Sequence, residues 1–287
     1  MCKYCDQDYI DNIEVNLCDD CNKPFTLSDN VRVLTMGQSY NQPIDLARVT
    51  TFVMGHKYNQ PIDLAGVTTF IMGYKYNQPI DLAGVKTFTM GYKYNQPIDL
   101  AGVTTFTMGG RYDQPIDLAE VTTFTMGYYY NQMINLAKVT TFTMGYWYNQ
   151  PIDLAGVTTL KMGGKYNQPI DLAKVKTFTM GDRYHQKIDL AGVTTFIMGY
   201  WYNQPIDLAG VSTLTMGYYY DQPIDVTRVT HITIRNSNYS HELNISDDTV
   251  YIDSDTIIPD QYYPKLKYCM IQGEVLLDKR EITKSMY

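Results

Sequence analysis

The sequence predicts an all-β protein, a parallel β-solenoid built from coils of 18 residues. The first observation is a tyrosine that recurs every 18 residues from Tyr40 to Tyr220 without an insertion or a deletion. The second is the segment that each tyrosine opens, some version of Tyr-Asn-Gln-Pro-Ile-Asp. The third is a short run of β-branched and aromatic residues that ends at a glycine before each tyrosine. One such unit cannot bury its own apolar side, so successive units must stack on one another.

The run from Thr51 to Met54 is the expected strand of one coil, and Gly55 ends it. Side chains alternate across a strand, so Phe52 and Met54 share one face while Thr51 and Val53 share the other. The first pair is large and apolar in nearly every copy. We therefore expect that pair to point into the solenoid, with the strands of successive coils parallel and in register.

The rest of each coil is expected to be a compact, non-helical return segment. Pro61 and its equivalents exclude a helix there, so this segment is extended or turn-like. The asparagine and glutamine before this proline recur in most copies, and we expect rows of such side chains to bond backbone groups of neighbouring coils. Four more positions hardly vary and should complete the interior: Leu46, Val49, Tyr58 and Ile62.

Residues 1–30 are predicted to form an N-terminal zinc-binding segment. The four cysteines follow a C-x2-C-x12-C-x2-C spacing: Cys2, Cys5, Cys18 and Cys21. Four thiolates in two such pairs suit one tetrahedral Zn²⁺, which would fold a segment too short for a core of its own. The segment would either cap the first coil or recruit a partner. A RING-type ligase needs more ligands than this spacing supplies, and a redox pair is the remaining alternative.

The repeats are expected to fill residues 31–235, and residues 236–287 to hold degenerate coils and a C-terminal cap. The strand spacing of the repeat returns in residues 229–234 and again in residues 266–271. Another strand is expected within residues 248–253. The open end of a stacked array must be covered, and terminal coils that differ from the repeat can serve as that cap.

Charge is uneven along the chain, whose formal net charge is −7. Residues 1–30 carry two basic residues against seven acidic ones, and residues 236–287 carry five against nine. The repeats between them are close to neutral. Acidic ends around a neutral middle argue against generic binding to DNA or RNA, which needs many phosphate-neutralising cations. No apolar run approaches the roughly 18 residues of a membrane span, so no membrane partner is expected.

Enzymatic activity is not expected. The sequence contains no P-loop, dinucleotide fingerprint, His-Glu-x-x-His site or nucleophile elbow. Catalysis needs unlike groups that converge in a pocket, whereas a filled solenoid presents repeated groups on its surface.

Two outward surfaces vary between copies, and recognition is expected there. One is the open face of the sheet; the other is the pair of residues just before each repeated tyrosine. Exposed aromatic and basic residues are enriched at interface hot spots. The alternative is that these rings only cover the shoulder of the solenoid. The candidate partner-binding residues are Tyr74, Lys75, Tyr92, Lys93, Arg111, Tyr129, Trp147, Lys161, Lys165, Arg183, Trp201 and Tyr219.

The repeated string Val-Thr-Thr-Phe-Thr-Met-Gly-x-x-Tyr-Asn-Gln-Pro-Ile-Asp resembles the FNIP repeat, a leucine-rich-repeat relative of amoebae and their giant DNA viruses. The family's unit is about four residues longer, and the shorter unit favours a tighter, straighter solenoid. The resemblance implies a leucine-rich-repeat-like scaffold for protein contacts and no enzymatic activity. The N-terminus carries acidic residues where a secretory signal needs an apolar core, so the protein is expected to be intracellular. The resemblance implies an amoebal or viral source, and the expected place is the host cytoplasm or nucleus, or the virion if the protein is viral.

The leading expectation is therefore a non-catalytic protein–protein interaction scaffold with an unidentified protein partner. One alternative is nucleic-acid or carbohydrate binding through the basic and aromatic turn residues and the zinc segment. A minor alternative is ice binding by the Thr-x-Thr pattern of the strands. The sequence does not fix the oligomeric state.

Overall fold

The computed structural model describes the backbone of most of the chain. The described residues are Tyr4, 7–46, 48–235, Tyr239, 241–243 and, for their backbone alone, the strands at 251–254, 268–271 and 274–278. The chain divides into two compact units, Met1–Tyr148 and Asn149–Tyr287.

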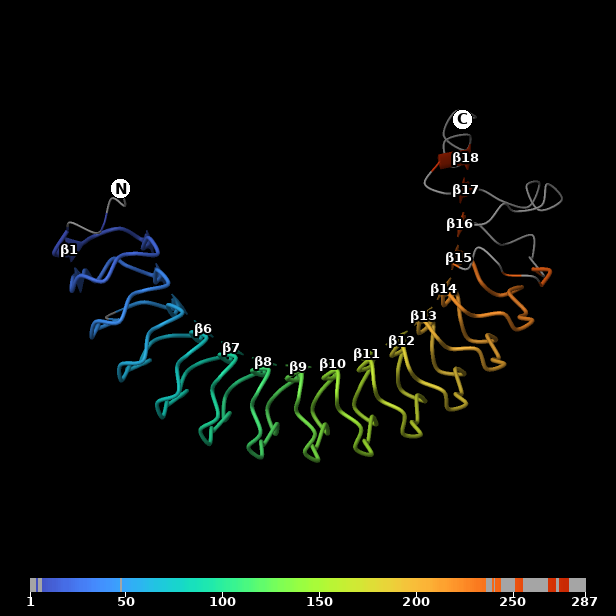
Figure 1. Ribbon diagram of the computed structural model, residues 1–287, viewed down its shortest axis with the longest axis horizontal. Coiled ribbons are helices and arrows are strands. Elements are labelled where there is room, and N and C mark those ends of the chain that lie inside the picture. The colour runs from blue at the N-terminus through green and yellow to red at the C-terminus, as the bar shows by residue number, and fades with distance from the viewer. Residues whose placement is uncertain are drawn as a thin grey trace, which may run out of the picture. The chain divides into compact units, whose positions relative to one another are not determined.

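The first unit is a stack of coils, and from β5 onward each coil has one short strand (Figure 1). β2 and the strands from β4 to β10 form a parallel ladder, in which Phe52 of β5 pairs with Phe70 of β6, the equivalent residue of the next coil. β1 pairs in parallel with β3 on another side of the first coils. The strands are β1 Tyr9–Ile10, β2 Glu14–Asn16, β3 Thr26–Leu27, β4 Val33–Thr35, β5 Thr51–Val53, β6 Thr69–Ile71, β7 Thr87–Thr89, β8 Thr105–Thr107, β9 Thr123–Thr125 and β10 Thr141–Thr143.

The second unit continues the same pattern. Its strands are parallel from β11 to β17, and only β18 runs antiparallel, against β17. The strands expected within residues 248–253 and 266–271 correspond to β16 and β17. The bounds are β11 Thr159–Lys161, β12 Thr177–Thr179, β13 Thr195–Ile197, β14 Thr213–Thr215, β15 His231–Ile234, β16 Tyr251–Ser254, β17 Tyr268–Ile271 and β18 Glu274–Asp278.

The predicted fold class, an all-β parallel solenoid, is confirmed, and so is most of its predicted interior. Phe52 and Met54 are buried, as are Val49, Leu46 and Tyr58 with their equivalents in the other coils. The prediction for Ile62 is wrong, because this side chain is only half-buried. The residues on either side of it, Pro61 and Asp63, are exposed, so this part of the coil runs along its outer rim.

Each unit curves, with its strands on the inner side. Successive rings at the strand positions are 5.6 Å apart, both for Phe52–Phe70 and for Phe178–Phe196. Successive rings at the return segment are 6.4 Å apart, as in Tyr58–Tyr76. The coils therefore fan outward from the sheet. The expectation of a straighter solenoid is wrong within each unit, since the tyrosines hold the return segments further apart than the strand spacing of about 4.8 Å.

Rows of polar side chains join one coil to the next, as the sequence predicts for asparagine. The backbone N–H of Asn59 donates to Oδ1 of Asn41 at 2.9 Å, and the same bond recurs along both units. The hydroxyl of Thr68 donates to the carbonyl of Thr50 at 3.2 Å. These bonds satisfy backbone groups that a coil without helix or broad sheet would otherwise leave unpaired.

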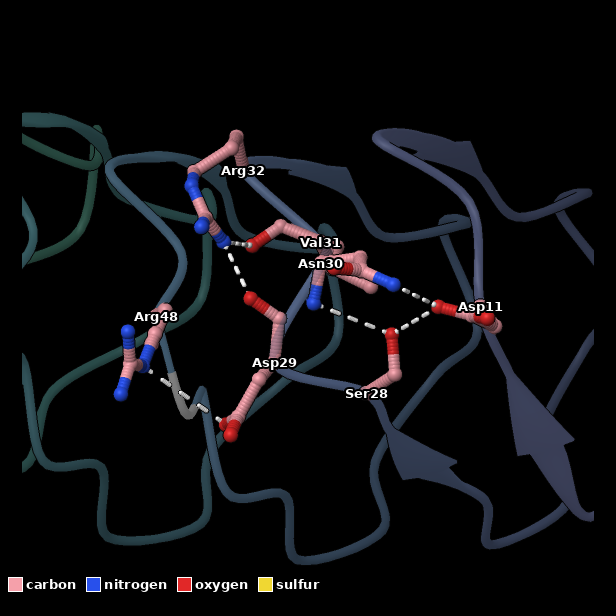
Figure 2. A network of polar contacts seen from close by, with 7 residues as sticks. All are labelled: Asp11, Ser28, Asp29, Asn30, Val31, Arg32 and Arg48. Carbon is pink, nitrogen blue, oxygen red and sulfur yellow. Dashed lines mark hydrogen bonds and ion pairs between the residues drawn. The ribbon is translucent and has the colours of Figure 1, made fainter.

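A network of polar contacts secures the first coils (Figure 2). Ser28, which is buried, donates its hydroxyl hydrogen to the carboxylate of Asp11. Nδ2 of Asn30 donates to the same carboxylate oxygen at 2.8 Å. Arg32 donates to the carbonyls of Asp29 and Val31, and Arg48 approaches the Asp29 carboxylate at 3.8 Å. The network thus holds together three successive passes of the chain.

Candidate interaction surface

The two residues before each buried tyrosine form a continuous outer surface in each unit, which we call the turn row. A glycine starts each turn, and the N–H of Tyr76 closes one by donating to the carbonyl of Gly73 at 3.3 Å. The N–H of Lys75 donates to the carbonyl of His56 in the preceding coil at 3.1 Å. Because this bond recurs between coils, equivalent residues of the turn row are immediate neighbours.

The first position of the turn row carries stacked rings. His56 and Tyr74 have ring centres 4.7 Å apart, and Tyr74 and Tyr92 follow at 5.1 Å. The stack is interrupted at Gly110. The Tyr92 ring lies over this glycine, so closely that a β-carbon at position 110 would clash with the ring. The Tyr92 ring thus occupies the space that a side chain at position 110 would fill.

The second position carries a cation from Lys57 to Arg111 and again at Lys165 and Arg183, and a ring in the coils between and after them. Nζ of Lys93 lies 5.6 Å from the ring centre of Tyr74, and the Arg111 guanidinium lies 5.4 Å from that of Tyr92. Such distances are those of cation–π contacts. Each cation therefore lies over the ring that the preceding coil presents at the first position.

Two groups of four rings stand out on the turn row, which we call the aromatic clusters. In the first unit Tyr128 stacks on Tyr146 at 5.0 Å, and Trp147 meets Tyr146 edge-on at 5.7 Å. Tyr129 completes that cluster and is 53% exposed. The second cluster lies four repeats further along the chain and consists of Tyr200, Trp201, Tyr218 and Tyr219.

The second cluster repeats the stacked pair of tyrosines at the first position, but its tryptophan lies in the first of its two coils rather than in the second. Tyr200 stacks on Tyr218 at 5.1 Å, and Trp201 meets Tyr200 edge-on at the same distance. Trp201 and Tyr219 stack at 4.3 Å with planes 5° apart. The candidate residues named from the sequence include the second-position ring of each coil in the clusters but omit the first-position rings there, which stack in pairs: Tyr128 on Tyr146 and Tyr200 on Tyr218. The spacing of four repeats between equivalent pairs is the sequence signal that could have found them.

The other candidate residues named from the sequence lie on two different surfaces. Lys161 lies on β11 and is exposed on the sheet face, away from the turn row. Lys165 and Arg183 are on the turn row of the second unit, beside Gly164 and Asp182, where no ring stands at the first position. The sheet face itself presents half-exposed threonines, interrupted by Ile71 and Ile197.

Cys18 and Cys21 belong to a coil of the array. β2 pairs in register with β4, which places Cys18 against Gly37. Oδ1 of Asn22 accepts the N–H of Asn41 at 2.8 Å, the bond that links asparagines along the whole row. Cys21, which is buried, thus takes the place of the repeated tyrosine. The ladder therefore begins before residue 31.

Only two of the four predicted zinc ligands, Cys18 and Cys21, lie among the described residues. Cys2 and Cys5 lie outside the described residues. The N–H of Cys21 donates to the carbonyl of Cys18 at 3.1 Å, so these two thiols share one tight turn. Thiolates at this spacing suit zinc. Among the described residues, no three or more His, Cys, Asp or Glu side chains gather as a metal site would require.

The buried tyrosines serve packing. Burial raises the pKa of Tyr58 to about 12, with a further contribution from the neighbouring Tyr76. The Tyr58 hydroxyl donates to the carbonyl of Pro61 at 3.3 Å. Phenols with such a pKa stay neutral at physiological pH, which fits a structural row rather than an acid–base site.

Comparison with known proteins supports the fold alone. No known protein-family profile matches the chain, and no curated protein does. Among solved structures, the chain is similar to CroV588 of a giant virus, described as a novel circular leucine-rich-repeat protein, with a TM-score of 0.58 and 14% identity. The alignment covers 85% of this chain and 50% of that protein, so the chain spans half of its length. The chain is thus a leucine-rich-repeat-like solenoid. Among the described residues there is no helix long and apolar enough to cross a membrane.

Proposed function

We propose that this protein is a non-catalytic scaffold for protein–protein interaction, and that its turn row is the binding surface. The observation that carries the proposal is the pair of exposed aromatic clusters four repeats apart, in each of which the two first-position tyrosines stack on one another. Tyrosine and tryptophan supply large contact area at a small entropic cost and dominate interface energetics. Rings such as Trp147, 42% exposed, are not needed to fill the interior, which is already packed beneath them.

Two other functions are less well supported. Nucleic acids and sugars bind by stacking on open ring faces, whereas rings such as Tyr74 and Tyr92 stack on one another. Ice binding needs a flat, regular array of threonines. The inner face of each unit is curved, and Ile71 and Lys161 interrupt its threonine rows.

The proposal includes one zinc ion held by Cys2, Cys5, Cys18 and Cys21, which would close the N-terminal end of the array. Cys21 stands where the coils from Tyr40 to Tyr220 have a buried tyrosine. A metal at this end would supply the stability that the missing ring does not. We also propose that the repeats belong to the FNIP type and that the protein acts inside cells, in the host or the virion of a virus.

The proposal is tested by cross-linking and affinity capture from native host extracts. The test variants replace the exposed rings of each cluster with serine: Tyr129→Ser with Trp147→Ser, and Trp201→Ser with Tyr219→Ser. The matched control replaces exposed apolar residues of the sheet face in both units, Ile71→Ser with Ile197→Ser. We expect a discrete partner whose capture falls in each cluster variant and is retained in the control. Capture lost only in the control variant would assign binding to the sheet, and no specific partner at all would contradict the scaffold.

A further inference from the structure

The turn row of the first unit contains a basic stretch in four successive coils. Its members stand at the second position and are all exposed: Lys57, Lys75, Lys93 and Arg111. Within the described part of the chain, none of the four forms an ion pair. Like charges so close together repel one another, so this arrangement is stabilised when an anion neutralises them.

Acidic residues occur near the basic stretch, but their carboxylates are engaged elsewhere or lie at its ends. Asp19 and Asp20 occupy the turn row of the N-terminal coil, two coils before Lys57, and Asp19 accepts bonds from Gln38. Asp113 follows Arg111 in the same coil, and its carboxylate accepts a bond from Gln132 at 3.2 Å. The centre of the stretch, Lys75 and Lys93, thus faces solvent.

Aromatic rings hold two of the cations in place before any partner arrives. Lys93 lies over Tyr74 and Arg111 over Tyr92, at 5.6 and 5.4 Å from the ring centres. Lysine and arginine lose much rotamer entropy when they are fixed. A partner that meets side chains already held over rings pays less of that entropy, so the stretch is preorganised for an anion.

The chemistry of the partner follows from which faces of the aromatic rings remain accessible. A single-stranded nucleic acid would need free ring faces for its bases, but the faces of Tyr74 and Tyr92 are covered by each other and by the two cations. The net charge of −7 also disfavours a long polyanion such as nucleic acid. A short acidic stretch of polypeptide has neither difficulty.

We propose that the basic stretch binds an extended, acidic segment of a partner polypeptide. The inference rests on the proposed scaffold function and names the chemistry of one partner. Three coil intervals of about 4.8 Å span about 14 Å, which an extended chain covers with about five residues. A segment of that length with several Asp or Glu side chains matches the four cations.

The test is fluorescence anisotropy of a labelled hexaglutamate peptide with the full chain at low and moderate salt. The variant Lys75→Glu with Lys93→Glu alters the centre of the stretch. Lys86→Glu with Lys138→Glu, exposed on another turn of the same unit, makes the same change in net charge. We expect salt-sensitive binding that weakens more than about tenfold in the first variant and less than about twofold in the second.

Three results would overturn the inference: no binding of hexaglutamate, an equal loss in both variants, or tighter binding of an oligothymidylate of equal charge that depends on the same lysines. The scaffold proposal is judged separately. Suppose that Lys75→Glu with Lys93→Glu captures a native partner as well as the wild type does, while replacement of the aromatic clusters abolishes capture. This result would support the scaffold function and reject the acidic segment.

Discussion

A β-carbon at position 73 would stand 2.2 Å from the carbonyl oxygen of Gly55 in the preceding coil. No side chain fits at that distance, and the atom in the way is backbone, which cannot move without displacing the coil. The glycine before each turn therefore sets how closely successive turns approach, and with it the continuity of the turn row.

We predict that Gly73→Ala destabilises the first unit severely, by several kcal/mol, because the backbone must shift to admit the methyl group. Gly84→Ala is the control, since Gly84 has a φ of 89° but open space around its β-carbon. It should cost only about 1–2 kcal/mol, the penalty of the left-handed conformation. Urea unfolding followed by circular dichroism compares the two. Equal losses would show that conformation, rather than close approach, selects glycine.

Much of the coil follows from the sequence, because each position is repeated often enough to reveal its role. The alternation at Phe52 and Met54 predicts strand and interior together, and the asparagine row predicts its own hydrogen bonds. Ile62 shows the limit of this reasoning, since a recurring apolar residue can lie on the rim. Curvature could not be predicted, because it depends on the difference between ring spacing and strand spacing.

The candidate site was predicted less completely. The exposed turn rings follow from their variation between copies, but the stacking of Tyr128 on Tyr146 depends on how the folded coils place the two rings. The N-terminal coil was missed because Cys21 replaces the tyrosine and one extra residue shifts the spacing. Asn22-Lys23-Pro24-Phe25 still matches Asn-Gln-Pro-Ile, and that match could have revealed the coil.

Alkaline pH should unfold the array cooperatively. A buried phenol whose folded pKa is raised from 10.0 to about 12 contributes stability that is complete below pH 10 and lost as pH rises towards 12. Tyrosines of both units share this shift, with burial as the main cause: Tyr58, Tyr76, Tyr94, Tyr130, Tyr148, Tyr184 and Tyr202. We expect a step in tyrosinate absorbance that coincides with the loss of the β-sheet signal in circular dichroism.

Tyr76→Phe provides the control for that titration. The Tyr76 hydroxyl is buried and finds no acceptor among the described residues, so its removal should cost little at neutral pH. The variant should also retain its fold to slightly higher pH, because one titrating group is gone. An alkaline transition that shifts to lower pH in this variant would contradict the argument.

The Asp11 network should weaken in acid. Hydrogen bonds from Ser28 and Asn30 lower the pKa of Asp11 below its usual 3.8. Its stabilising contribution is therefore present above pH 3.8 and lost as pH falls through the lowered value. We expect amide exchange at β3 and β4 to accelerate in that range, and Asp11→Asn to show the faster exchange already at neutral pH. Exchange at β8, in the same unit but outside the network, is the internal reference.

Zinc should bind with a stoichiometry of one per chain and should order the N-terminal coil. Metal analysis of the purified protein measures the first, and amide exchange of β2 before and after chelation measures the second. Cys18→Ser and Cys21→Ser should each lose the metal, since a tetrahedral site with three thiolates binds zinc far more weakly. Cys269→Ser, outside the predicted ligand set, should keep it. Full metal content in Cys21→Ser would reject the site, and unchanged exchange after chelation would show that the metal does not close this end of the array.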